Sequence, residues 1–425
     1  MRDYSQSTLR EEFFKPVERA LESAENNRKC AGLDDFSFVQ TWVLRALEMI
    51  DSGRGWLQKV RSILNSFISI SASFRTLRSE RRLSILEEVN NSVISQNNAA
   101  AGDDPFRDHR ELDNFAIYAA DGHYQACSAH EEPNQGKKRP TGHFFAANLR
   151  THSMHHLDVA RPDTMCKKKG EHDMHVLKRL DPEKLRMGEP KGRKVIISYD
   201  PAVIDFIQWR KWKKCKGIYI FTQEKQNMAL TIIGEPEFDT ADARNNGVES
   251  DQFVASSNGV NLRRIKYTDP ATGKTYSFIT NEMTLPPGLL AYIYKKRWDI
   301  EKIFDEMKNK LHEKKAWSKN PTAQCQQAIF QCLCHNLMLI MERKLEREEG
   351  VYEEKSRHKK KQRAQQDIRQ AKEAGRPENP LPIKVHRATQ RSLQFIRWLR
   401  DGIALQTSWR RAVTQIGPLM QKYLA

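Results

Sequence analysis

Four polar residues, Tyr294, Arg297, Glu301 and Lys308, recur at a spacing that puts them on one side of a predicted helix. Each helical residue advances roughly 100° around the axis, so the four fall at about 0°, 300°, 340° and 320° and share an arc of roughly 60°. The apolar residues of the segment cluster on the neighbouring arc, at about 220° to 280°: Ile293, Ile300, Phe304, Met307 and Leu311. The pattern predicts a helix that buries its apolar arc and holds the polar stripe at the border, where an active-site rim would lie.

Two aspartates lie far upstream, each in or just after an apolar strand-like run. Asp121 interrupts the run that begins at Asn114, and Asp200 ends the run that begins at Lys194. A lone buried carboxylate is costly unless it is paired or binds a metal, and Mg²⁺ prefers oxygen ligands. Two aspartates and a glutamate from separate elements are therefore the set that a two-metal phosphoryl-transfer site requires.

Each of these residues also has a plainer interpretation. Asp200 precedes Pro201, so it fits a turn or a helix cap as well as a metal ligand. Arg297 and Glu301 stand four residues apart, as in an ordinary helical salt bridge. Two further acids are close enough to replace the assigned ones: Asp305, one turn beyond Glu301, and Asp205, five residues after Asp200.

The composition indicates a polyanionic partner. The chain has 425 residues with a formal net charge of +17, and its length is that of two or three domains. No apolar core of a signal peptide and no run of the roughly 20 apolar residues that a spanning helix needs is present, so we expect a cytoplasmic protein without a membrane partner. The seven cysteines are expected to be reduced, and Cys332 and Cys334 to be buried in a helix rather than to bind zinc.

The periodicity divides the chain into helical and strand-rich stretches. It predicts helices from about 8 to 95, a linker over 96–107, and then strands in an antiparallel meander. Further strands fill about 217–280, between the second aspartate and the helix with the polar stripe. A helix over 323–345, a basic run and a helical tail follow. The basic run is either a solvated helix or an arm that contacts phosphates.

The spacing Y-x2-R-x3-E-x6-K, matched by the stripe without a gap, resembles the signature of the DDE insertion-sequence transposases called the YREK class. The resemblance covers roughly 114–345. It implies an α/β fold with an RNase H-like core, a mixed five-stranded sheet with helices that carries a β-rich insertion, and helical regions at both ends. The resemblance divides the chain into five parts. They are a helical N-terminal domain with a DNA-binding role left open (1–100), the first part of the core (108–213), the insertion (214–285), the second part of the core with the glutamate helix (286–346) and a basic helical C-terminal region (347–425).

The resemblance also implies roles for single residues. Asp121, Asp200 and Glu301 would be the catalytic acids that bind two Mg²⁺ ions, for which Mn²⁺ can substitute. Tyr294, Arg297 and Lys308 would bind DNA phosphates. The implied activity is that of a cut-and-paste DNA transposase, a polynucleotidyl transferase that cleaves at inverted-repeat ends and transfers the strands.

The partners implied are double-stranded DNA, as transposon ends and target, and a second copy in a homodimer assembled on DNA. In a prokaryote such a protein would be associated with the nucleoid. The alternatives are a metal-dependent nuclease of the same fold and a catalytically silent DNA-binding descendant.

Two features stay open at this level. Some members hold an extruded base against a tryptophan in the inserted strands, but 215–283 contains no tryptophan, so a hairpin intermediate is undecided. The residues that could offer a stacking face instead are Tyr219, Phe221, Tyr267, Tyr276, Trp209, Trp212 and Trp298, and we expect Trp298 to pack under the helix. A histidine-rich region also allows a zinc site, although His155 and His156 should point to opposite faces of one strand.

Overall fold

The computed structural model describes most of the chain. The described residues are 7–25, 33–50, 52–64, 69–100, 102–129, 140–160, 171, 173–226, 228–312, 314–381 and 388–421. Within them, no helix is long and apolar enough to cross a membrane. Cys30, Cys166, His130 and His172 lie outside the described residues.

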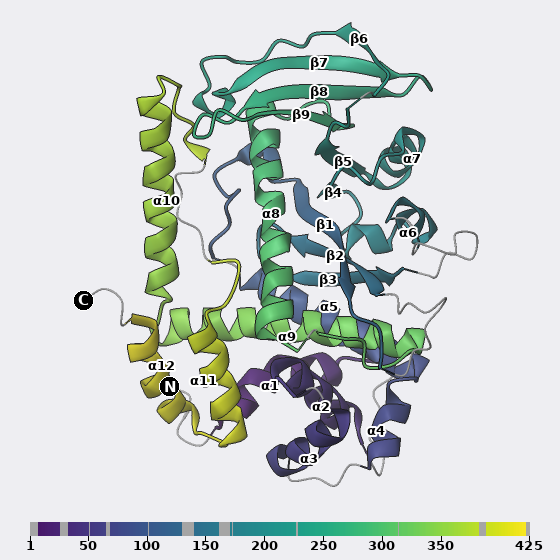
Figure 1. The fold of residues 1–425 in the computed structure, drawn as a ribbon, viewed down its shortest axis with the longest axis vertical. Coiled ribbons are helices and arrows are strands. Elements are labelled where there is room, and N and C mark those ends of the chain that lie inside the picture. Colours follow the sequence, from purple (N-terminus) through teal and green to yellow (C-terminus); the bar gives the residue numbers. More distant parts are fainter. Residues whose placement is uncertain are drawn as a thin grey trace.

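A single nine-stranded mixed sheet runs through the protein in the order β3-β2-β1-β4-β5-β9-β8-β7-β6 (Figure 1). The strands are β1 (Phe115–Gln125), β2 (Thr141–Asn148), β3 (Met154–Val159), β4 (Lys194–Ser198), β5 (Ile218–Gln223), β6 (Leu230–Gly234), β7 (Val248–Ser256), β8 (Asn261–Thr268) and β9 (Thr275–Thr280). β1, β2 and β3 form the predicted antiparallel meander, and β4 and β5 add to β1 in parallel. The predicted mixed α/β fold is confirmed, and it is consistent with an RNase H-like transposase core.

The strand-rich insertion does not form a separate sheet. β9 pairs antiparallel with β5, and β8, β7 and β6 follow outward from it, so the insertion extends the core sheet by four strands. The sheet ends at β6, whose side chains are mostly exposed. This continuity matters for the site, because Phe221 of β5 and Phe278 of β9 pack their rings against Tyr294 in the upper half of the glutamate helix.

Helices cover the sheet and fill both ends of the chain. They are α1 (Leu9–Glu22), α2 (Asp35–Leu47), α3 (Gly53–Leu64), α4 (Ile70–Thr76), α5 (Glu80–Ala99), α6 (Asp173–Arg179), α7 (Phe206–Lys216), α8 (Pro287–Lys310), α9 (Pro321–Glu348), α10 (Glu354–Glu373), α11 (Leu393–Ala404) and α12 (Trp409–Gln421). α8 runs across one face of the sheet, and α9 crosses beneath it (Figure 1). α5 is longer than predicted and takes the first part of the expected linker into its last turn.

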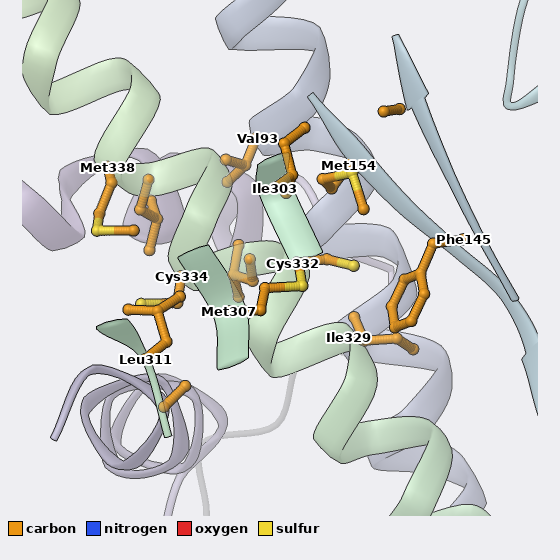
Figure 2. Packing of buried hydrophobic residues seen from close by; sticks show 14 of the residues in the cluster. Val93, Phe145, Met154, Ile303, Met307, Leu311, Ile329, Cys332, Cys334 and Met338 are labelled. Carbon is orange, nitrogen blue, oxygen red and sulfur yellow. The ribbon is translucent and has the colours of Figure 1, made fainter. Parts of the chain in front are cut away.

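One hydrophobic core joins α8, α9, the N-terminal helices and the sheet. Ile303 and Met307 of α8 meet Phe145 of β2 and the middle of α9 in this core (Figure 2). Cys332 and Cys334 have no exposed surface there, so the prediction of buried helical cysteines is confirmed. The apolar arc predicted for α8 is also buried, since its five residues are at most 4% exposed. The N-terminal helices pack into the same core, and the division into five domains stays a prediction.

Candidate active site

Two adjacent parallel strands bring Asp121 and Asp200 to the same level of the sheet: Asp121 lies within β1, beyond its pairing with β4, and Asp200 follows the end of β4. β1 and β4 are in parallel register, with Ala119 opposite Ser198. Both aspartates lie two residues beyond that pair, so the two carboxylates stand at the same level along the strand direction. Parallel strands place their carboxyl ends at one edge, which is where ligands bind in open α/β sheets.

α8 brings the third acid to this edge. Its buried arc rests on the sheet, and the adjoining arc carries Arg297 and Glu301 towards Asp121. The Arg297 Nη1 atom lies 3.0 Å from Asp121 Oδ2 and 3.8 Å from Glu301 Oε1. The guanidinium, 176 residues from Asp121 in sequence, therefore links an acid of the sheet to an acid of the helix.

The electrostatics of Asp121 reflect this crowding. Burial raises the pKa of Asp121 to about 7; Arg297 acts in the opposite direction, and the nearby Glu301 and Asp200 raise the pKa further. Two neighbouring carboxylates disfavour a third charge at short range. The three acids thus form one electrostatic unit with more negative charge than a single guanidinium balances.

The other residues of the stripe differ in their surroundings. Tyr294 is 7% exposed and packs its ring 4.8 Å from that of Phe278; burial, foremost, raises its pKa. Lys308 is exposed, two turns beyond Glu301, and the structure does not bring it against the acids. The prediction that Trp298 packs under the helix is wrong: the side chain is 58% exposed, since position 298 falls outside the apolar arc.

The two neighbouring acids have other partners. Asp205 caps α7, where its Oδ1 accepts from the backbone N–H of Gln208 at 2.9 Å, and it also pairs with Lys178. Asp305 accepts from the side-chain amides of Asn309 at 2.6 Å and Gln390 at 2.7 Å. Neither faces the strand ends in these contacts, so the acids grouped by the structure are the three first assigned.

Asp200 combines the two interpretations considered from the sequence. Its Oδ1 accepts from the backbone N–H of Ala202 at 2.9 Å, which is the geometry of a local turn. It also acts on Asp121 electrostatically. The turn therefore fixes the direction of the Asp200 side chain rather than removing it from the site.

The donor set fits divalent cations by its chemistry. Carboxylate oxygens are the ligands that Mg²⁺ prefers, and a bound cation would oppose the burial and the neighbouring carboxylates that raise the pKa of Asp121. With the side chains in this arrangement, however, the described part of the chain contains no group of three or more His, Cys, Asp or Glu that could hold a metal ion. Arg297 takes the position between Asp121 and Glu301.

The histidine-rich region is a packed cluster. His143 Nδ1 lies 3.3 Å from His156 Nε2, and burial lowers the pKa of His143 to about 3. His155 faces the opposite side of β3, towards the ring of Tyr118 at 5.8 Å, so the predicted orientation of this pair is confirmed. His123 stacks on Phe304 at 4.5 Å, close to the acids along β1.

A cavity of about 200 Å³ opens beside the upper part of α8. Six aromatic residues from α8, β8 and β9 line it: Tyr267, Tyr276, Phe278, Tyr292, Tyr294 and Trp298. Three of them were among the stacking faces considered from the sequence, whereas Trp209 and Trp212 are buried in α7 and cannot serve. Asn379 and Leu381 also line the cavity, and no sequence pattern indicated that a segment after α10 reaches this place.

Strand order, register and the acids at the strand ends define a mixed α/β protein with an acidic centre on an RNase H-like core. Residues 117–337 match the family model described as the transposase DDE domain. That match spans more than half of the chain, so the protein belongs to the transposase DDE domain family.

One curated protein extends the comparison. The chain is 26% identical over 151 residues to "Putative transposase y4zB" of Sinorhizobium fredii (strain NBRC 101917 / NGR234), which is 34% of this chain and 42% of that protein. The match therefore spans less than half of the relative's length. The narrower assignment to the YREK class remains a prediction.

Proposed function

We propose that the protein is a cut-and-paste DNA transposase that binds inverted-repeat ends, hydrolyses the phosphodiester bond there and transfers the freed 3′ end to target DNA. The observation that carries this proposal is the meeting of Asp121, Asp200 and Glu301 at one edge of the sheet, inside the region that matches the transposase domain. The three acids come from β1, the end of β4 and α8, so only the folded core assembles them.

Each residue of the site has a role in this proposal. Asp121, Asp200 and Glu301 would hold two Mg²⁺ or Mn²⁺ ions, which when bound would activate the attacking oxygen and stabilise the leaving one. Arg297 holds Asp121 and Glu301 in place before substrate binds, and its planar fork is suited to a phosphate once the acids have other partners. Tyr294 would place its hydroxyl group at the buried side of the site.

DNA would reach the site across a basic surface. α10 carries eight lysines and arginines against three acids, and Ala371 is its buried residue. It is fixed beside α8 by Lys295, whose Nζ lies 3.9 Å from Asp367 Oδ2. We infer that the exposed basic side chains of α10, together with Lys308, contact backbone phosphates, which supply most of the affinity for duplex DNA.

The aromatic cavity supports one further part of the proposal. It lies one turn along α8 from Arg297 and is open to the exposed ring of Trp298. Nucleobases stack on aromatic side chains whatever their sequence. We infer that an unpaired base next to the cleaved bond is held there, which would permit a hairpin intermediate.

A strand-transfer assay tests the proposed function. The probes are duplexes made from the DNA that flanks the gene, together with a supercoiled target and Mg²⁺ or Mn²⁺. We expect wild-type protein to cut at the ends and join them to the target, and Asp121→Ala to do neither while it still binds DNA. Cleavage without joining would indicate a nuclease, and DNA binding without cleavage would indicate a catalytically silent descendant.

We also propose that the active form is a homodimer, because two ends must be cut and joined in one complex. The measurement is the mass of the complex with end DNA in solution. A complex that cuts and joins two ends with a single protomer would contradict the proposed homodimer.

A further inference from the structure

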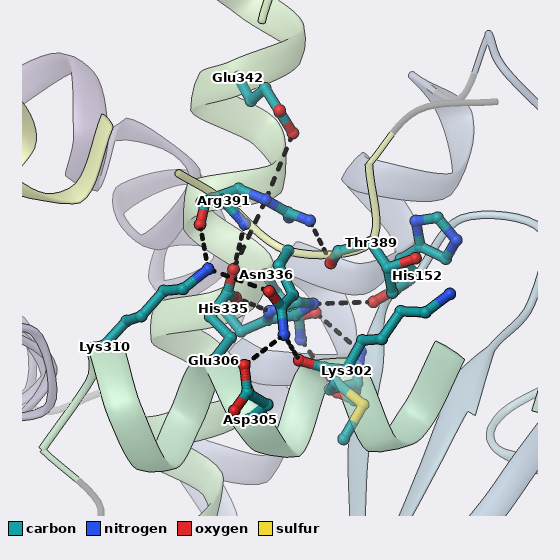
Figure 3. A network of polar contacts seen from close by, with 12 residues as sticks. His152, Lys302, Asp305, Glu306, Lys310, His335, Asn336, Glu342, Thr389 and Arg391 are labelled. Atoms are coloured by element: carbon teal, nitrogen blue, oxygen red, sulfur yellow. Dashed lines mark hydrogen bonds and ion pairs between the residues drawn. The ribbon is translucent and has the colours of Figure 1, made fainter. Parts of the chain in front are cut away.

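A short segment between α10 and α11 lies against the side of α8 opposite its apolar arc. We call residues 388–392 the strap. Thr389 Oγ1 donates to Asp299 Oδ1 at 3.1 Å. Gln390 Nε2 donates to the carbonyl of Lys302 at 2.6 Å, and the strap crosses the helix at this point (Figure 3).

The lower half of the strap is tied to α8 by buried charges. Arg391 has a fully buried side chain, and its backbone N–H donates to Glu306 Oε2. Its Nε lies 3.5 Å from Glu342 of α9, so the strap is anchored to two helices at once. Lys310 Nζ donates to the Arg391 carbonyl at 2.7 Å (Figure 3).

These contacts hold α8 on a side where polar contacts outnumber the apolar packing, which reaches it at Tyr292 and Ile303. On the scale that places Tyr294 at 0°, the α8 residues that touch the strap fall at about 20° to 160°: Asp299, Lys302, Asp305, Glu306 and Lys310. The apolar arc lies at about 220° to 280°, against the sheet and α9. His152 and His335 also contact this side of α8, at Asp299 and Glu306. The strap adds to these directional contacts, which restrain the rotation of the helix about its axis more closely than apolar packing on one arc does.

The rotation of α8 decides where Glu301 lies relative to Asp121. Side-chain atoms stand about 5–6 Å from a helix axis, so a turn of about 10° moves the Glu301 carboxylate by about 1 Å. Asp299 and Lys302, which the strap touches, are the near neighbours of Glu301 in the same turn. A misplacement of about 1 Å at a reacting centre can reduce a rate about 100-fold.

We propose that the strap is a positioning device for the catalytic helix, with Thr389 and Gln390 setting the rotation of α8 and Arg391 anchoring the segment. The proposal rests on the function proposed above, because the strap acts through Glu301 and touches no substrate. It assigns a role in catalysis to a segment that lies outside the residues matched by the family model.

Thr389→Val tests the proposal in the full-length protein, since it removes the hydrogen bond to Asp299 with almost no change in shape. We expect kcat for end cleavage to fall about 10-fold to 100-fold, with the KM for end DNA within about twofold of wild type. Thr389→Ser, which keeps the hydroxyl, should restore kcat. Thr414→Val is the matched control: Thr414 is exposed on α12 and donates to the Arg410 carbonyl of the same helix, so the change should leave kcat as in wild type.

Amide hydrogen exchange of α8 provides a readout that needs no activity. Thr389→Val and Gln390→Ala should each speed exchange at 299–310 and leave α12 as in wild type. Wild-type kcat in Thr389→Val, no rescue by Thr389→Ser, or unchanged exchange in α8 in both variants would overturn the proposal. If wild-type protein cleaves no DNA, the proposed function fails, and the exchange data still decide whether the strap holds α8.

Discussion

Glu306→Gln should destabilise the protein strongly at neutral pH. Glu306 has no exposed side-chain surface; its Oε1 lies 2.7 Å from His335 Nδ1, and its Oε2 accepts from the Arg391 backbone. Burial acts to raise the pKa of Glu306, but Arg391 and His335 outweigh it and hold the pKa at about 2, against an ordinary value of 4.5. The folded state therefore stabilises the ionised form of Glu306 more than the unfolded chain does.

The size and the sign of the effect follow from that difference. A shift of between two and three units is worth about 3 kcal/mol of stability at 1.36 kcal/mol per unit. Removing one partner of a buried ion pair typically costs about 3–5 kcal/mol, which agrees in magnitude. Because the folded pKa is depressed, this stability is fully present above pH 4.5 and is lost as the pH falls from about 4.5 to about 2.

The assay is urea unfolding of wild type and Glu306→Gln, followed by tryptophan fluorescence at pH 7, 5, 4 and 3. We expect a loss of about 3 kcal/mol at pH 7 that shrinks at pH 4 and shrinks further at pH 3, because glutamine has no charge to lose. Glu348→Gln, whose side chain is 45% exposed at the end of α9, is the control and should stay within about 0.5 kcal/mol. A loss below about 1 kcal/mol at pH 7, or one that does not shrink with pH, would refute the reasoning.

Three further predictions concern the site and its DNA. Asp121→Asn should raise the unfolding temperature at pH 8 in chelator, because the raised pKa of Asp121 costs stability progressively between pH 3.8 and about 7; a scan at pH 3.5 should show no gain, and destabilisation at pH 8 would contradict it. Trp298→Ala should leave the free energy of unfolding within about 0.5 kcal/mol of wild type, since the ring is exposed, but reduce end cleavage in a single-turnover assay. Unchanged cleavage would contradict the proposal that the aromatic cavity holds a base. Lys359→Gln with Lys361→Gln should reduce the slope of log affinity against log salt by about 1.8 in titrations with end duplex, and an unchanged slope would make α10 a solvated helix.

The residues that the fold groups around Asp121 were largely predictable because their signals are local. An aspartate inside an apolar strand and a polar stripe beside an apolar arc are visible in the sequence, and they led to Asp121 and Glu301 without any knowledge of the contacts between them. The periodicities predicted the helical and strand-rich stretches, and the family resemblance implied the mixed α/β fold. The assignment of the acids as metal ligands is still a prediction.

What the sequence could not supply are contacts between segments that are distant along the chain. The ion pair of Arg297 with Asp121 competes with the helical pair to Glu301, and only the fold shows that one guanidinium serves both. The sequence does not predict the strap, because Thr389 and Gln390 belong to no periodic pattern. Trp298 was expected to pack under the helix, but its angle of about 40° on the scale that places Tyr294 at 0° lies outside the apolar arc and its side chain is 58% exposed.

The central claim is most directly tested by cleavage of end DNA by Glu301→Gln in Mg²⁺, with Glu348→Gln as the matched control. The amide removes an anionic ligand with almost no change in shape, and both glutamates have similarly exposed side chains, at 41% and 45%. We predict that Glu301→Gln loses cleavage at least about 100-fold while it still binds and folds, and that Glu348→Gln cleaves like wild type. Wild-type cleavage by Glu301→Gln would contradict the account and remove Glu301 from the site.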